Sequence, residues 1–190
     1  MYNARVNVLA IADRRPKIDI LEVVTRNNIG LIITLGDLTR GDLLQLEQIT
    51  TIPKIGVYGN HDSGTYMPEL GIWDMNLKIW DYNGLRFGGF QGCVRYKESP
   101  GAIMCTQEEA SQLMANFPKV DVFLCHCPPR GINDEEEIAH QGFNSLRDYI
   151  EREQPKVLLH GHTYPTEENV IKQHGSTRIE YVYEYKIVTL

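Results

Sequence analysis

The chain has 190 residues, of which 42% are hydrophobic and 23% charged, and its formal net charge is −6. This length and composition are typical of one globular domain, which we expect to span residues 1–190. The negative charge argues against a broad nucleic-acid-binding face. No stretch approaches the roughly 18 consecutive apolar residues of a transmembrane helix, so we expect no membrane partner.

Two features indicate a cytoplasmic protein. Residues 1–12 lack the long apolar region and the cleavage site of a signal peptide. The cysteines Cys93, Cys105, Cys125 and Cys127 form no C-x-x-C pair, and a chain of this size does not need disulfides to fold. Because Cys125 and Cys127 flank His126, a thiolate metal site is one interpretation, and we prefer buried thiols at a strand end.

The first third of the chain predicts alternating strands and helices. Apolar runs predict buried strands at residues 6–11, 31–35 and 52–57. An apolar stripe predicts a helix over residues 18–27, and Asp42 is positioned to cap a second helix over residues 43–49. A β-α-β-α-β order of this kind is typical of a parallel sheet with crossover helices.

The rest of the chain predicts a hairpin and then further α/β units. Residues 77–82 and 85–87 flank an Asn83-Gly84 turn, and Thr106 with Glu109 forms a capping box for a helix over residues 106–116. We expect strands at 120–125 and 157–160 and a helix at 145–153. Alternation over residues 170–187 predicts antiparallel strands at the end, so the second sheet is expected to be the more antiparallel.

Polar residues follow directly after each predicted buried strand. They are Asp13, Asp37, Asn60-His61-Asp62, His126 and His160-Gly161-His162. The carboxyl ends of parallel strands meet at one edge of a sheet, and clustered carboxylates repel unless a cation lies between them. Mixed oxygen and imidazole ligands suit Mn, Fe, Zn, Co or Ni, so we expect a divalent transition metal, bound as one or two ions.

Four motifs resemble those of a known family in order and spacing. Gly36-Asp37, Gly59-Asn60-His61-Asp62, His126 with Pro128-Pro129, and Gly161-His162 are similar to the motifs of calcineurin-like metallophosphoesterases. The matching motifs extend from Asp13 to Tyr164. The segment from Cys125 to Lys156 also resembles the compact phosphodiesterase-type branch of this family, which has no large cap domain.

The resemblance implies an α/β fold, specifically a four-layer α/β/β/α sandwich, with a two-metal site. It implies that Asp37 bridges the metals, that Asn60, His126 and His162 complete the second metal's ligands, and that Asp13 belongs to the first metal. It also implies a metal-activated hydroxide attacking phosphorus. His61 would be the general acid beside the leaving group, and Asp62 would orient His61.

The sequence departs from the family pattern at the first metal. Arg15 stands where the first motif of the family has histidine, and Tyr164 stands at the second histidine of the last motif. One hypothesis is that the Arg15 guanidinium replaces much of the missing metal charge, with the Tyr164 hydroxyl as its hydrogen-bond partner. The other is that Arg15 points to solvent and the first metal binds weakly through Asp13, Asp37 and water.

The predicted substrate is a small phosphorylated molecule, either a phosphodiester or a phosphomonoester. Arg15, Tyr164 and His140 are the candidate substrate-binding residues, His140 because it precedes a helix start where anions bind. A catalytically weak family member that acts as a binding or scaffold module is the first alternative. A nuclease is the second, and the net charge of −6 disfavours it.

Overall fold

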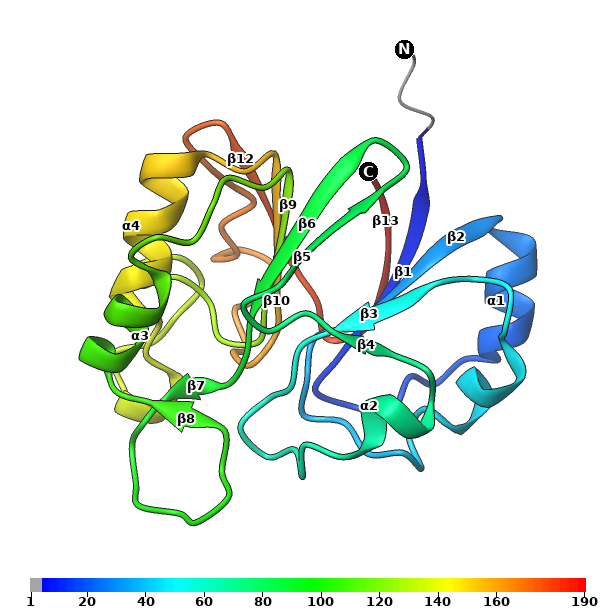
Figure 1. The fold of residues 1–190 in the computed structure, drawn as a ribbon, viewed down its shortest axis with the longest axis horizontal. Helices are drawn as coiled ribbons and strands as arrows, with labels where there is room; N and C mark the ends of the chain where they lie inside the picture. Colours follow the sequence, from blue (N-terminus) through cyan, green and yellow to red (C-terminus); the bar gives the residue numbers. More distant parts are fainter. Residues whose placement is uncertain (1–4) are drawn as a thin grey trace.

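The computed structural model describes residues 5–190 and shows four layers, with two β-sheets packed face to face and helices on both outer surfaces (Figure 1). The predicted α/β/β/α sandwich is therefore confirmed. The expectation that no leader peptide starts the chain falls partly on residues 1–4, which lie outside the described residues. Within residues 5–190, no helix is both long enough and apolar enough to cross a membrane.

The first sheet contains the three strands predicted at the start of the chain. Its order is β13-β1-β2-β3-β4, in which β1 to β4 are parallel and β13 is antiparallel to β1. The bounds are β1 (Asn7–Ala12), β2 (Ile29–Thr34), β3 (Lys54–Gly56), β4 (Trp73–Asp74) and β13 (Glu184–Thr189). Its outer face is covered by α1 (Ile20–Arg26), the 3₁₀ helix η1 (Leu44–Gln48) and α2 (Tyr66–Glu69).

The predicted α-helix over residues 43–49 was wrong in type and in its cap. The segment is the 3₁₀ helix η1, and Leu43 precedes it without a side-chain cap. The Asp42 carboxylate instead accepts hydrogen bonds from the backbone N–H and the hydroxyl of Thr39, at 2.9 and 2.7 Å. A short aspartate side chain that bonds locally within a turn competes with its use as a helix cap.

The second sheet has the order β11-β12-β10-β9-β6-β5. Its strands are β5 (Ile79–Tyr82), β6 (Leu85–Phe90), β9 (Val122–Cys125), β10 (Val157–His160), β11 (Gln173–His174) and β12 (Thr177–Tyr181). The predicted hairpin is confirmed as β5 and β6, joined by Asn83 and Gly84 with φ of 52° and 76°. Positive φ at both central residues is the requirement of the tight type I′ turn.

As expected, the second sheet has the larger share of antiparallel pairings, which are β5 with β6 and β11 with β12. Its centre is parallel, because β12, β10, β9 and β6 all run in the same direction. The alternating residues near the end form strands with antiparallel neighbours, as expected, but these strands belong to two different sheets. The chain leaves the second sheet after β12 and enters the first as β13, so the alternation continues through a crossing between sheets.

The outer face of the second sheet is covered by α3 (Gln107–Met114) and α4 (Asn144–Glu153) (Figure 1). The predicted capping box is confirmed, with the Thr106 hydroxyl accepting from the Glu109 N–H and the Glu109 carboxylate accepting from the Thr106 N–H. Cys125 and Cys127 are buried in this layer, and burial raises the pKa of both thiols. They therefore act as packing groups, as preferred from the sequence.

A core between the two sheets fixes where their ends meet. Val8, Ala10, Leu31 and Ile33 of the first sheet pack against Phe87, Val122, Leu124 and Leu159 of the second. The loops after β2 and β3 therefore lie beside the loops after β9 and β10. This packing brings the polar residues that follow those strands together at one edge of the sandwich.

Candidate metal centre

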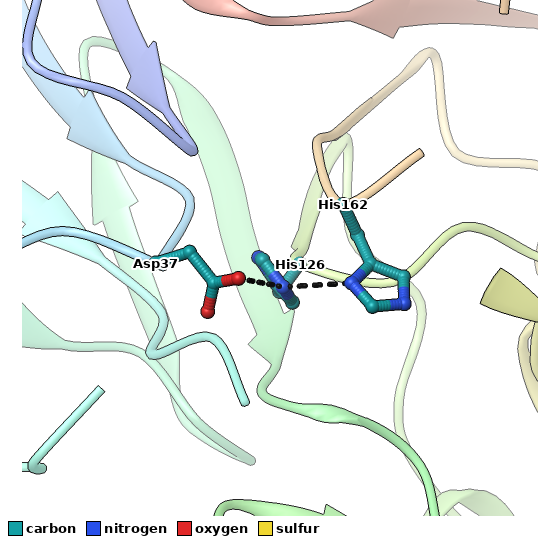
Figure 2. A group of neighbouring side chains, drawn as sticks. All are labelled: Asp37, His126 and His162. Atoms are coloured by element: carbon teal, nitrogen blue, oxygen red, sulfur yellow. Dashed lines mark hydrogen bonds and ion pairs between the residues drawn. The ribbon is translucent and has the colours of Figure 1, made fainter. Parts of the chain in front are cut away.

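Asp37, His126 and His162 converge at this edge (Figure 2). Asp37 follows β2 of the first sheet, whereas His126 and His162 follow β9 and β10 of the second. Each contributes one donor atom, and these atoms all lie within 4.8 Å of one another. Both histidines are buried and Asp37 is partly buried. The three side chains connect the two sheets, and their ligand atoms have the separations expected around a metal ion.

Backbone carbonyls set the orientation of both histidine rings. The Nδ1–H of His126 donates to the Leu35 carbonyl at 2.7 Å, which directs Nε2 into the centre. The Nε2–H of His162 donates to the Ala139 carbonyl at 2.8 Å, which directs Nδ1 toward the same point. Such outer hydrogen bonds fix the tautomer and aim of a metal-binding histidine.

The candidate ligand atoms of the other three residues all face His126 Nε2. Its neighbours are Asn60 Oδ1 at 3.0 Å, His162 Nδ1 at 3.1 Å and Asp37 Oδ2 at 3.5 Å. Three acceptor atoms around one point repel unless a proton or a metal ion lies between them. Two imidazole nitrogens, a carboxylate and an amide oxygen suit a divalent transition metal, so the residues present fit the expected cofactor.

The pKa values show a proton held at this position. Burial lowers the pKa of His126, but the Asp37 carboxylate, Asp13 and the Leu35 carbonyl outweigh it and raise the value to about 9. Burial raises the pKa of Asp37, but His126 and the His61 N–H outweigh it and lower the value to about 2. Burial and the neighbouring His126 charge lower the pKa of His162 to about 3. The surroundings of His126 Nε2 therefore favour a positive charge at this position.

The backbone around these ligands is unusual. Asp13, Asp37 and His162 have φ of 64°, 54° and 72°, in the left-handed region that non-glycine residues rarely adopt. Such strain persists only where the surrounding structure imposes it, and it clusters at functional sites. At Gly59, a Cβ would collide with Asp37 Oδ1 and would lie 2.7 Å from the His126 ring. Glycine is therefore required for this close approach.

Asp13 provides a second carboxylate on the far side of the centre. Both of its carboxylate oxygens accept from the His162 N–H at 3.0 Å, and Oδ1 lies 3.9 Å from His126 Nδ1. Burial raises the pKa of Asp13 to about 6, although His126 and the His162 N–H oppose it. Asp13 is thus close to the centre but is not one of the three residues that directly converge.

His61 and Asp62 are placed differently from each other. The His61 N–H donates to Asp37 Oδ1 at 2.8 Å, and its side chain is exposed. The Asp62 carboxylate is buried and accepts from the backbone N–H groups of Asp37, Leu38 and Gly59, at 3.0, 2.7 and 2.7 Å. These contacts of Asp62 tie the two ligand loops together, whereas the expected contact was with the His61 ring.

Arg14 and Arg15 directly follow the turn at Asp13 and lie against different parts of the structure. Arg15 is exposed and lines a hollow beside α1 and η1, together with residues such as Lys17, Asp19 and Gln45. Within residues 5–190, no ion pair joins Arg15 to Asp13. The neighbouring Arg14 lies with its guanidinium carbon 5.6 Å from the centre of the Tyr183 ring. This placement favours the second hypothesis, in which Arg15 points to solvent.

Tyr164 and His140 lie beside the candidate ligand His162. The His140 ring centre is 5.4 Å from that of His162 and 6.0 Å from that of Tyr164. The Tyr164 ring meets Tyr183 edge to face at 5.7 Å. Partial burial raises the pKa of Tyr164, and the nearby charges of Asp13 and Asp37 add to the effect.

Several residues at the site were missed from the sequence. The Leu35 and Ala139 carbonyls give no sequence signal, because any residue supplies a carbonyl. Tyr183 was read only as part of an alternating strand, and Arg14 was passed over for Arg15. Arg14 could have been recognised as a site residue because it directly follows Asp13 in the sequence.

This chain belongs to the calcineurin-like phosphoesterase family, whose model matches residues 13–165. No curated protein matches it. Among solved structures, it is similar to TT1561 of Thermus thermophilus, at 14% identity and a TM-score of 0.62, covering 98% of each chain. It is also similar to GAP50, described as the anchor in the inner membrane complex of Plasmodium. That likeness has 10% identity and a TM-score of 0.55, covering 93% of this chain and 71% of that one.

Proposed function

We propose that the protein hydrolyses phosphoester bonds with at least one divalent transition metal ion held by Asp37, Asn60, His126 and His162. The observation that carries this proposal is the convergence of Asp37, His126 and His162 within 4.8 Å, with both rings aimed by backbone carbonyls. Manganese is the ion we would test first. A small phosphodiester or phosphomonoester is the proposed substrate.

The bound ion would supply Lewis-acid activation of water and of the phosphoryl group. His61 would donate a proton to the departing oxygen, because its side chain is exposed while its backbone is held against Asp37. General acids of this kind contribute typically ~10²–10⁴-fold. Asp62 would hold the Asp37 and Gly59 loops in their relative positions and would not touch the substrate.

We also propose that the Asp13 side of the site binds a second ion weakly or not at all. Arg15 stands where the family has histidine and faces a separate hollow. Metal content after dialysis tests this directly. The expected value is close to one firmly held ion per chain, and two would contradict it.

Hydrolysis of bis(p-nitrophenyl) phosphate with added Mn²⁺ tests the catalytic proposal. We expect metal-dependent turnover by the native protein and, on an ester with a poor leaving group, a loss of about 10²-fold or more in His61→Ala. For a leaving group as good as p-nitrophenolate the effect shrinks, so the His61 variant is also compared on an alkyl ester. His174→Ala, which removes a histidine paired with Glu151, is the matched control.

The second candidate is a binding or scaffold module. It is favoured by the likeness to GAP50, described as an anchor, and by the altered Arg15 and Tyr164 positions. Turnover that is absent with every divalent metal tried would favour this candidate. The cytoplasmic location and the absence of a nucleic-acid partner stay predictions. The free thiols, of which Cys93, Cys125 and Cys127 are buried, support the first.

A further inference from the structure

A row of aromatic rings extends from the metal centre across the mouth of the site. Successive ring centres lie 5.4 Å apart for His162 and His140, 6.0 Å for His140 and Tyr164, and 5.7 Å for Tyr164 and Tyr183. The Arg14 guanidinium lies over Tyr183 and ends the row. The row therefore connects a buried metal ligand to the surface through side chains of separate loops.

Tyr164 is the exposed member of this row, with 56% of its surface accessible. It is absent from all three of the hydrophobic clusters that form the layers. Tyr183 and His140 both meet its ring in edge-to-face contacts, so the ring is positioned while much of its surface stays open. Tyrosine that serves only packing would bury its ring, because the apolar ring area is the source of its stabilisation.

Tyr164 also forms one wall of a hollow of about 330 Å³. The other lining residues are mainly polar, and they are Gly131, Asn133, Asp134, Glu135, Pro165, Thr166, Asn169 and Ile171. Glu135 brings a half-exposed carboxylate that lies 3.9 Å from His140. A second phosphate would be repelled here, whereas a neutral ring with hydrogen-bond donors would be accommodated.

We propose that Tyr164 is a stacking platform for a nucleobase-like ring, so that the substrate is a nucleotide phosphoester whose phosphate lies at the metal centre. The inference rests on the proposed function and adds the substrate class to it. The metal end of the row attracts the phosphate, and the Glu135 carboxylate in the hollow disfavours a second one, so the neutral ring of the substrate lies over Tyr164. Stacking of a base on an aromatic side chain is sequence-tolerant, because every base has a π-face.

Two diesters that share a leaving group test this inference. Thymidine 5′-(p-nitrophenyl phosphate) carries a base, and methyl p-nitrophenyl phosphate does not. With Mn²⁺ present, we expect a higher kcat/KM for the thymidine ester. In Tyr164→Ala the ratio of the two kcat/KM values should fall about tenfold, through KM, since the stacking contribution is lost.

Tyr164→Phe keeps the ring and should keep the ratio. Tyr185→Ala removes another exposed tyrosine, 39% accessible on β13, and should leave the ratio unchanged. Turnover of both esters with an unchanged ratio in Tyr164→Ala would overturn the stacking role and leave the proposed hydrolase intact. A fall of the kcat/KM ratio in Tyr164→Phe would also overturn the stacking role, because the hydroxyl rather than the ring would then contact the base.

Calorimetry supplies a readout that does not depend on turnover. Adenosine 5′-phosphate should bind at least about tenfold more tightly than ribose 5-phosphate, and Tyr164→Ala should remove the difference. If the native protein hydrolyses neither diester, the proposed function fails. The difference in affinity between adenosine 5′-phosphate and ribose 5-phosphate then decides by itself whether Tyr164 stacks on a base. Equal binding of the two phosphates by the native protein would overturn the stacking role.

Discussion

His126 is the residue on which the centre depends. Its Nδ1 is bonded to the first sheet through Leu35, and its Nε2 faces Asn60, Asp37 and His162. Its pKa of about 9 means that, without metal, the ring carries a proton at neutral pH. Without metal, a proton on Nε2 would therefore compete with a metal ion for the same position.

This competition predicts proton release on metal binding. At pH 7, binding of one Mn²⁺ should release close to one proton, because His126 must lose the proton that its raised pKa retains. Calorimetry in two buffers of different ionisation enthalpy measures that number. A binding enthalpy that is independent of the buffer would show that His126 is already neutral.

The same shift has a signed effect on the metal-free protein. The folded-state pKa of His126 is raised from 6.5 to about 9, so its contribution to stability is fully present below 6.5 and is lost as pH rises through about 9. Metal should therefore stabilise the protein more at pH 9 than at pH 6. Melting temperatures with and without Mn²⁺ at the two pH values check this.

Asp62 is predicted to be a stability residue. Asp62→Asn places an amide NH₂ among three backbone N–H donors, so we expect a loss of about 3 kcal/mol of unfolding free energy. Asp42→Asn is the matched control, because that carboxylate bonds only locally to Thr39 on the surface. Denaturant unfolding of the two variants compares them. Equal losses would contradict the role given to Asp62.

Among the elements, the turns after the strands decide the geometry of the site. Gly59 allows the loop after β3 to contact the loop after β2, since a Cβ there would lie 2.5 Å from the Asp37 backbone nitrogen. Gly41 lies in the loop before η1, and a Cβ there would meet only Thr39 Oγ1, at 3.6 Å. The two glycines therefore differ in what an added methyl group would displace.

Gly59→Ala should lose about 1–3 kcal/mol of stability and most of its metal affinity, because Asp37 and His126 must both move. Gly41→Ala should stay within about 0.5 kcal/mol of the native protein. Thermal unfolding and Mn²⁺ titration of both variants measure these effects. Unchanged metal affinity in Gly59→Ala would show that the loops adapt.

The sequence predicted the elements that its local patterns determine. The buried strands, the Asn83-Gly84 hairpin and the Thr106 capping box were all found, and so was the convergence of Asp37, His126 and His162. Convergence was predictable because each ligand follows a strand and strand ends share an edge. The crossing between β12 and β13 was not predictable, because an alternating pattern indicates a strand without indicating its sheet.

The direction of side chains after a turn was also beyond the sequence. After Asp13, whose φ is 64°, Arg14 lies over Tyr183 whereas Arg15 lies on the α1 side. Nothing in the spacing of the two arginines distinguishes them. Likewise, Asp62 was expected at His61, and only the packing of two loops revealed that it bonds to their backbones.

In the molecule as a whole, the metal centre joins the two sheets. Asp37 and Asn60 come from loops of the first sheet, and His126 and His162 come from loops of the second. An ion bound there is therefore a crosslink of the sandwich. A ligand that binds only the folded state stabilises it by about 2.7 kcal/mol at roughly 100 times its Kd.

We expect Mn²⁺ at roughly 100 times its Kd to raise the unfolding free energy by about 2.7 kcal/mol, and EDTA to remove the gain. His162→Ala should show no gain at the same Mn²⁺ concentration, while His174→Ala should behave as the native protein. Denaturant unfolding with and without metal provides the measurement. An equal gain in His162→Ala would place the ion elsewhere.

The pairing of β1 with β13 has a consequence for how the protein is made. Asn7 lies opposite Thr189, so residues near both ends of the chain must meet to complete the first sheet. Contacts between distant residues form slowly, because a long loop must close before they contribute. During synthesis, the four proposed metal ligands precede β13, while β1 still presents an open strand edge. An early-bound ion would hold the two halves together during that interval, when edge-to-edge association with other chains is the competing reaction.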